Sequence, residues 1–310
     1  MRGSSSIHSR PSFASALSGI TSRLTFAGMK RARLADRGVV RVAGADARRF
    51  LNGLVTADLS QVPVRACFAA LLTPQGKIIV DFMAAETEGG FLLDCPHPLV
   101  ATLVERLKFY RLRAKIAIDD LSESLAVVAI WDGGGSEAGS CYPDPRLGEL
   151  GLRCIVPLAQ ASANTDAAEY EAHRIALGVP QGGLDFAYGD AFPHEADMDQ
   201  LNGVDFAKGC FVGQEVVSRM EHRGLARTRV VPVAIDGAAP AIGTAVTAGG
   251  KPIGTMGSAA RGRGLAALRL DRVEEALAQG TPLTADEATL RLVKPAWARF
   301  AFPGEAKAAE

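Results

Sequence analysis

The order of apolar segments between residues 39 and 118 constrains the fold of this 310-residue chain most strongly. Residues 39–44 read as a short strand that ends at a glycine. The segment that follows, with Phe50, Leu51 and Leu54 at helical spacing, predicts a helix with Asp46 as its N-cap. These two elements begin an alternation of predicted strands and helices that continues to residue 118.

Residues 67–83 predict a hairpin, because two apolar runs flank a Thr-Pro-Gln-Gly turn. A strand at residues 91–95, an amphipathic helix at 99–109 and an extended segment at 113–118 follow. The resulting order is strand, helix, three strands, helix and strand. This order is typical of an α+β split arrangement and does not fit a regular βαβ winding.

The rest of the chain divides at Gly224. Before it, residues 125–131 read as a strand, and residues 167–178 as a helix that ends at a glycine. After it, short extended segments separated by glycine and proline predict a small all-β module, most simply a barrel. Gly262-Arg263-Gly264 imitates a dinucleotide-binding fingerprint, but it leads into a predicted strand where that fingerprint requires a helix.

These patterns predict a division of the chain into regions. We expect a tail or a mis-set start at residues 1–24, two intertwined α+β subdomains over 25–225 (roughly 48–119 and the remainder), a barrel over 226–303 and a tail at 304–310. Met1 to Ala35 contain no Asp or Glu and many Arg and Ser, as in a mitochondrial transit peptide. A true start at Met29 is the alternative, and both explanations stay open.

Composition argues against several classes of function. The formal net charge is zero, whereas proteins that grip a phosphate backbone carry a basic excess. No apolar run reaches the roughly 18 residues that a membrane-spanning helix needs. The five histidines show no HxxxH or HExxH spacing, so we expect no metal site. The five cysteines form no CxxC pair, and their odd number predicts a reducing compartment without a disulfide framework.

The segment from Gly182 to Arg223 is the most informative for function. It interleaves carboxylates with aromatic rings, which suits a flat, nitrogen-rich heterocycle: carboxylates accept from its N–H edge while rings stack on its face. An acidic surface loop with phenylalanines plugged into the core explains the same composition. Both interpretations remain open on composition alone.

Cys210 is the one cysteine with a sequence argument for reactivity. A helical pattern starts at Gln214, with Glu215 and Arg219 spaced for an i,i+4 ion pair. A thiol ahead of a helix N-terminus, with Lys208 nearby, lies in a positive potential that favours thiolate. The other four cysteines lie in apolar runs or loops and are expected to be structural.

Residues 208–219, Lys-Gly-Cys-Phe-Val-Gly-Gln-Glu-Val-Val-Ser-Arg, resemble the signature of the YgfZ family. The resemblance extends to an Asn-Gly…Thr-x-Asp segment at 51–58, a Pro-x-Gly-Lys hairpin at 73–78 and a Tyr-x-Leu-Arg-x-Lys segment at 110–115. The signature positions are Lys208, Gly209, Cys210, Gly213, Gln214, Glu215 and Arg219.

The resemblance implies a fold similar to the aminomethyltransferase of the glycine cleavage system: split ferredoxin-like α/β modules around a tetrahydrofolate cavity, plus a small C-terminal β-barrel. It implies that Glu195 holds the pterin edge, that Asp81 lies near the reactive folate nitrogen, and that Lys208 contributes to the cofactor site. Asp81 and Cys210 are the candidate catalytic residues.

The function that the resemblance implies is an accessory role in the assembly or repair of iron–sulfur enzymes, including radical enzymes that modify tRNA. Its partners would be iron–sulfur client proteins or assembly factors, with no direct nucleic-acid or membrane contact. Such a protein is cytoplasmic in a bacterium, or in the mitochondrial matrix if the N-terminus is a transit peptide. The alternatives are a folate-dependent aminomethyl or one-carbon transferase, and a non-catalytic module with structural folate.

Overall fold

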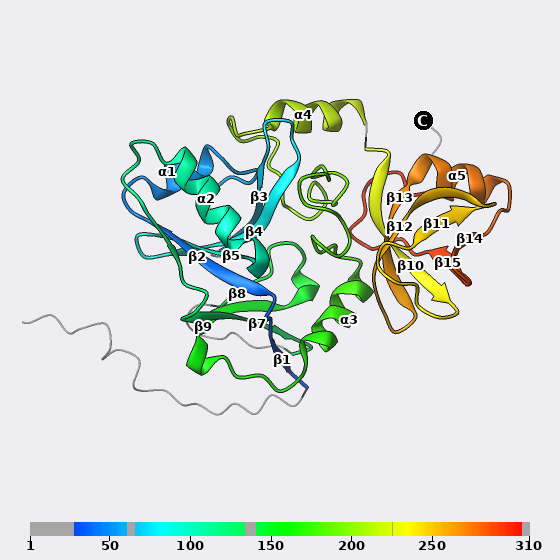
Figure 1. The fold of residues 1–310 in the computed structure, drawn as a ribbon, viewed down its shortest axis with the longest axis horizontal. Helices are drawn as coiled ribbons and strands as arrows, with labels where there is room; N and C mark the ends of the chain where they lie inside the picture. Colours follow the sequence, from blue (N-terminus) through cyan, green and yellow to red (C-terminus); the bar gives the residue numbers. More distant parts are fainter. Residues whose placement is uncertain (1–27, 61–65, 134–140, 225, 306–310) are drawn as a thin grey trace, which may run out of the picture.

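The computed structural model describes residues 28–60, 66–133, 141–224 and 226–305, arranged as two open sheets and a closed barrel (Figure 1). The first sheet has five antiparallel strands in the order β3-β4-β5-β2-β6. Its elements are β2 (Arg37–Ala43), α1 (Ala47–Asn52), β3 (Ala66–Leu72), β4 (Ile78–Thr87), β5 (Gly90–Pro96), α2 (Val100–Tyr110) and β6 (Ala117–Asp120).

The two faces of this sheet are buried in different ways. Helices α1 and α2 cover one face, where Leu51, Leu103 and Leu107 pack among the strand side chains. The other face carries Phe68 and Met83 and belongs to the largest core. Because both faces are covered, all seven residues of β3 are buried, which explains why its sequence is apolar without alternation.

The second sheet follows the order β1-β7-β9-β8 and packs against the first across that core. Its elements are β1 (Lys30–Arg33), β7 (Leu125–Trp131), β8 (Cys141–Pro143), β9 (Leu152–Pro157) and α3 (Ala167–Leu177). Strand β1 precedes the first sheet in the chain yet pairs with β7 of the second. The chain therefore passes from the second sheet to the first and back to the second.

The six strands after residue 227 form the closed barrel β10-β13-β12-β11-β14-β15. Its elements are β10 (Thr228–Asp236), β11 (Ala245–Ala248), β12 (Lys251–Ala260), β13 (Arg263–Arg269), α5 (Leu270–Ala278), β14 (Leu283–Ala285) and β15 (Ala288–Leu292). Helix α4 (Gln214–Arg223) leads into the barrel (Figure 1). The predicted α+β fold with a closed C-terminal barrel is confirmed, while the domain boundaries at 25–225 and 226–303 stay a proposal.

The structure corrects three expectations. Cys141 and Cys154 lie opposite each other on β8 and β9 and form a disulfide, so the expectation of a chain without one is wrong. The first helix ends at Asn52 rather than reaching Leu54. Asp46 occupies the predicted N-cap position, but its side chain does not cap the helix, because its carboxylate accepts hydrogen bonds from the Lys115 backbone N–H and from Arg49.

The patterns that predicted only short extended segments after Gly224 missed helix α5, which begins at Leu270 directly after β13. No helix in the described parts of the chain is long and apolar enough to cross a membrane. The predictions for residues 1–24 and for most of 304–310 fall on residues outside the described ranges.

Candidate functional site

Asp81 lies on β4, on the sheet face that looks into the largest core, and it is 8% exposed. Its Oδ1 accepts a hydrogen bond of 2.5 Å from the hydroxyl of Tyr188. Burial and the neighbouring carboxylate of Asp81 raise the pKa of Tyr188 well above its ordinary value, so the hydroxyl keeps its proton and stays the donor. Oδ2 of Asp81 accepts no hydrogen bond from the described residues.

Glu195 lies in the long loop between α3 and α4, seven residues after Tyr188. Its Oε2 accepts a hydrogen bond of 2.9 Å from the Phe192 backbone N–H, which orients the carboxylate. Within the described chain, Oε1 has no such donor. Each of the two carboxylates thus keeps one oxygen for N–H donors, and this donor–acceptor chemistry fits the edge of a pterin.

A cavity of about 540 Å³ has Tyr188, the hydrogen-bond donor to Asp81, in its wall. This volume is in the usual range for small-molecule sites. Asp81 and Glu195 do not line the cavity themselves, so Tyr188 is the link between it and Asp81. Its apolar lining comes from Leu34, Pro96, Pro98, Leu99, Leu184 and Tyr188.

Lys208 is directed into the protein. Its ammonium donates to the backbone carbonyls of Asn52, Val55 and Ala57 at 2.8, 2.6 and 2.7 Å. These contacts join the signature segment to the end of α1 and the residues after it, where helix termini leave carbonyls without partners. Burial lowers the pKa of Lys208 to about 8. All three N–H donors of the ammonium are used, so its predicted cofactor role stays a prediction that requires these bonds to break.

Gly213 joins the signature segment to the β3–β4 hairpin. It has φ = +81°, and a Cβ at this position would lie 2.6 Å from the carbonyl oxygen of Thr73 and 3.0 Å from the Cα of Gly76. A glycine is therefore required both for the backbone conformation and for the close approach. Two motifs that lie more than 130 residues apart in sequence meet here.

Cys210 is exposed and unpaired between these two anchoring positions. Helix α4 begins four residues later, and the predicted ion pair within it is present, with Arg219 Nη2 2.6 Å from Glu215 Oε1. The other unpaired cysteines in the described residues are Cys67 and Cys95, both buried, and burial raises the pKa of each to about 12. Among the unpaired cysteines of the described residues, Cys210 is therefore the one that solvent and partner molecules can reach.

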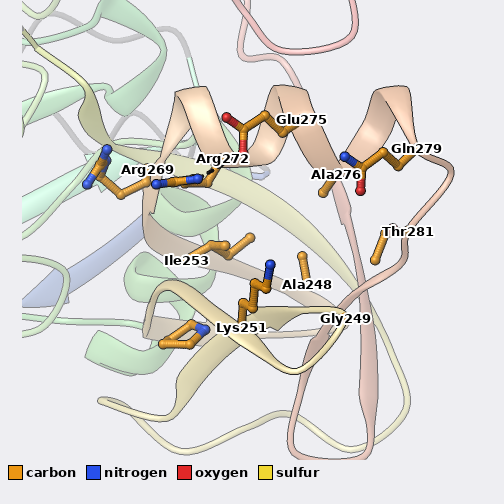
Figure 2. Close-up of a pocket in the computed structure, with 11 residues that line it drawn as sticks. Ala248, Gly249, Lys251, Ile253, Arg269, Arg272, Glu275, Ala276, Gln279 and Thr281 are labelled. Atoms are coloured by element: carbon orange, nitrogen blue, oxygen red, sulfur yellow. Dashed lines mark hydrogen bonds and ion pairs between the residues drawn. The ribbon is translucent and has the colours of Figure 1, made fainter.

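A second hollow, of about 580 Å³, lies on the barrel between the β11–β12 hairpin and α5 (Figure 2). Its lining includes none of Asp81, Glu195 and Cys210.

The sequence argument missed Tyr188 as a partner of Asp81, although this tyrosine lies in the loop whose aromatic and acidic composition signalled a site.

The chain has an aminomethyltransferase-like fold. The crystal structure of the glycine cleavage system aminomethyltransferase T from Bartonella henselae superposes with a TM-score of 0.69 over 90% of this chain and 88% of that one. The identity is 15%, so this likeness shows the fold alone. Residues 227–300 match the family model of the CAF17 C-terminal β-barrel domain.

Sequence relatives then give the family. Iron–sulfur cluster assembly factor IBA57, mitochondrial, from Mus musculus is 31% identical over 78% of both chains, and its Homo sapiens counterpart is 30% identical over 78% of both. The Mycosarcoma maydis homolog is 34% identical, and the match spans 74% of this chain and 62% of that protein's length. The chain belongs to the IBA57 family.

Proposed function

We propose that this protein is a tetrahydrofolate-binding accessory factor for the assembly or repair of iron–sulfur enzymes, including radical enzymes that modify tRNA. Its IBA57 relatives are named iron–sulfur cluster assembly factors, which supports an accessory role in that process. The observation that carries the proposal is Cys210, an exposed, unpaired thiol within a segment that Lys208 and Gly213 anchor to the first sheet. The resemblance of residues 208–219 to the YgfZ signature supports the extension to radical enzymes that modify tRNA.

Cys210 would act on client proteins or on other assembly factors, by thiol chemistry or by transient contact. Deleting the gene should lower the activity of iron–sulfur enzymes, and a Cys210→Ala copy should restore it poorly. Immunoblotting should show that the variant accumulates to the wild-type level, because an exposed cysteine contributes little to packing. Full restoration by Cys210→Ala would remove the thiol from the mechanism.

The folate part of the proposal is supported by Asp81 and Glu195, each with one oxygen available, and by the cavity that Tyr188 lines. Glu195 would hold the pterin edge, and Asp81 would face the reactive part of the cofactor. When bound, tetrahydrofolate would supply a carrier for one-carbon groups.

Calorimetric titration with tetrahydrofolate tests the folate part. Glu195→Ala should weaken binding at least about tenfold, since a hydrogen bond to a charged group contributes about 1.5–3 kcal/mol. Glu215→Ala is the matched control, because that glutamate is 84% exposed on α4. Unchanged binding in Glu195→Ala would show that this glutamate does not hold the cofactor.

Asp81 favours a second candidate function, folate-dependent aminomethyl or one-carbon transfer. A buried carboxylate with a protonated tyrosine as its donor would modulate proton transfer at a bound heterocycle. Purified protein given tetrahydrofolate and aminomethylated lipoyl carrier protein should then release ammonia, and Asp81→Asn should abolish that release. No turnover, under conditions where a genuine aminomethyltransferase works, excludes this candidate.

If folate is purely structural, neither Asp81→Asn nor Cys210→Ala affects iron–sulfur enzyme activity in cells.

The word mitochondrial in the names of the mouse and human relatives supports the matrix location over the cytoplasmic one. A fluorescent reporter fused behind residues 1–35 should enter mitochondria on this proposal. A reporter that stays in the cytosol contradicts it.

A further inference from the structure

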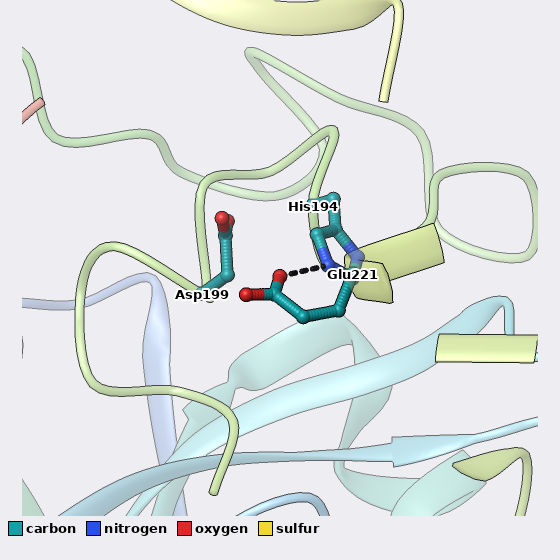
Figure 3. Close-up of side chains that lie close together, drawn as sticks. All are labelled: His194, Asp199 and Glu221. Carbon is teal, nitrogen blue, oxygen red and sulfur yellow. Dashed lines mark hydrogen bonds and ion pairs between the residues drawn. The ribbon is translucent and has the colours of Figure 1, made fainter. Parts of the chain in front are cut away.

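Three potential metal ligands meet at the far end of α4 from Cys210. His194 Nε2 lies 3.0 Å from Glu221 Oε2, and the ligand atoms of His194, Asp199 and Glu221 all lie within 4.8 Å of one another (Figure 3). Two ligands about 2.1 Å from one ion are separated by roughly 3.0–3.4 Å. The His194–Glu221 pair already has that spacing. The Glu221 side chain is 44% exposed, so it can shift and bring the ligand atoms to the distances that one ion requires.

Asp199 is held in place by a guanidinium. Arg229 donates to both of its oxygens, at 2.9 and 2.8 Å, and also to Asp197 and to the carbonyl of His194. Gln200 Nε2 also donates to Asp199 Oδ2, at 2.7 Å. Each carboxylate oxygen has two lone pairs, so Oδ2 is fully used and Oδ1 keeps one lone pair for an ion. Ligating carboxylates in metal sites are commonly fixed by such outer hydrogen bonds.

Two buried atoms beside this cluster lack a partner in the described structure, Nδ1 of His194 and Oδ2 of Asp197. His194 is 1% exposed and Asp197 0%. Buried polar atoms without hydrogen bonds are uncommon and often mark a missing water or ion. Nδ1 lies on the other side of the ring from the Nε2 that faces Glu221, so it needs a partner other than the ion of the cluster. Asp197 and Asp199 share the guanidinium of Arg229, whereas Glu221 pairs with His194, so Arg229 does not offset the charge of Glu221 and a cation at the cluster would.

We propose that His194, Asp199 and Glu221 bind a divalent transition-metal cation. One imidazole and two carboxylates suit Zn²⁺ or Fe²⁺ better than Ca²⁺ or Mg²⁺, which prefer oxygen ligands alone. Three protein ligands leave a coordination position for water, and the exposed Glu221 gives access from solvent. This site goes beyond the proposed folate and thiol functions and uses none of their residues.

The test is calorimetry on the tag-free, full-length protein after chelator treatment, titrated with Zn²⁺. Wild type should bind one ion per chain. Glu221→Gln should lower the Zn²⁺ affinity at least about tenfold. Removing a residue that only hydrogen-bonds to a metal ligand already costs about that much, and Glu221 is proposed as a ligand itself. Glu221 is exposed, so this variant should melt at the wild-type temperature.

Glu215→Gln and His222→Gln are the controls, since both residues lie on α4 outside the cluster and are exposed. Neither should change the Zn²⁺ affinity, and Cys210→Ala should leave it unchanged as well. Co²⁺ in place of Zn²⁺ should give visible ligand-field bands without a sulfur-to-metal charge-transfer band. No stoichiometric binding, equal affinity in Glu221→Gln, or a sulfur charge-transfer band would overturn the proposal.

Discussion

At the scale of single residues, the five cysteines fall into three chemical environments. Cys67 and Cys95 are buried thiols, Cys141 and Cys154 share a disulfide, and Cys210 is exposed and unpaired. Because only the thiolate is nucleophilic, burial that raises the pKa of the first two to about 12 makes them inert near neutral pH. Burial in the fold therefore separates the unpaired cysteines in the way that their sequence neighbourhoods suggest.

This difference predicts the labelling pattern of the native protein. N-ethylmaleimide under native, non-reducing conditions should add one label per chain, at Cys210, as measured by intact mass. Denaturation without a reductant should expose Cys67 and Cys95 and raise the total to three, because the disulfide protects the remaining pair. Native Cys210→Ala should take up none. Two or more rapid labels on the native wild type would contradict the burial of Cys67 and Cys95.

Lys208 illustrates how a signature residue can be structural. Lys208→Met removes the donor to three carbonyls and should lower the free energy of unfolding by about 2–4 kcal/mol, since buried acceptors left unpaired cost about 1–3 kcal/mol. Urea unfolding followed by circular dichroism measures this. Lys251→Met is the control, because Lys251 is exposed on the barrel and should cost less than about 0.5 kcal/mol. Equal effects would show that the carbonyl contacts are unimportant.

At the scale of elements, sequence periodicity and turn residues predicted the helices and strands whose formation depends on residues close by in the sequence. The hairpin of β3 and β4, helix α2 and the Gly178 end of α3 all follow from periodicity and turn residues, and all are present. The short strands β8 and β14 have three residues each, too few for any periodic signal. Tertiary pairing alone defines them.

The same limit applies to the candidate sites. The sequence predicted Glu195 and Asp81 only through resemblance, and the partner of Asp81 comes from a distant part of the chain. Tyr188 lies 107 positions from Asp81, and Glu221 lies 27 from His194. Spacing rules that search for ligands within one turn of a helix cannot find such pairs.

Gly213 and Gly224 offer a matched test of the contact between α4 and the hairpin. Both have positive φ, but a Cβ on Gly224 meets nothing within 4 Å, whereas one on Gly213 meets the Thr73 carbonyl oxygen at 2.6 Å. Gly224→Ala should cost about 1–2 kcal/mol from backbone strain alone. Gly213→Ala should cost at least about 1 kcal/mol more, because the hairpin must move. Equal losses of unfolding free energy in the two variants, measured by urea unfolding, would mean that the hairpin can move away from the added Cβ at no cost.

At the scale of the whole molecule, buried ion networks join the three sheets. Arg174 of α3 and Asp185 bond to Ser258 of the barrel, and Arg229 of the barrel bonds to the long loop. Between the two open sheets, Arg153 of β9 donates to Asp94 of β5. A buried charge without its partner costs far more than a surface one, so these networks fix how the units sit against one another.

Asp144, which follows β8, is the member of the inter-sheet network best suited to a test. Burial alone would raise its pKa, but the guanidinium groups of Arg146 and Arg153 outweigh burial and hold the pKa well below its ordinary value. The resulting stabilisation is complete above the unfolded-state pKa of about 3.9 and is lost as the pH falls below it. Asp144→Asn should therefore lower the free energy of unfolding at pH 7 by about 3–5 kcal/mol.

Urea unfolding across the acid range checks both the size and the sign of this effect. The gap between wild type and Asp144→Asn should be constant from pH 7 to about pH 5 and should narrow below about pH 4, because wild type then begins to protonate the paired carboxylate on unfolding. Asp190→Asn serves as the control, since that side chain is 89% exposed and its ion pair with Lys77 spans 3.8 Å. A gap that stays flat into the acid range would mean that Asp144 holds the two sheets together without its charge.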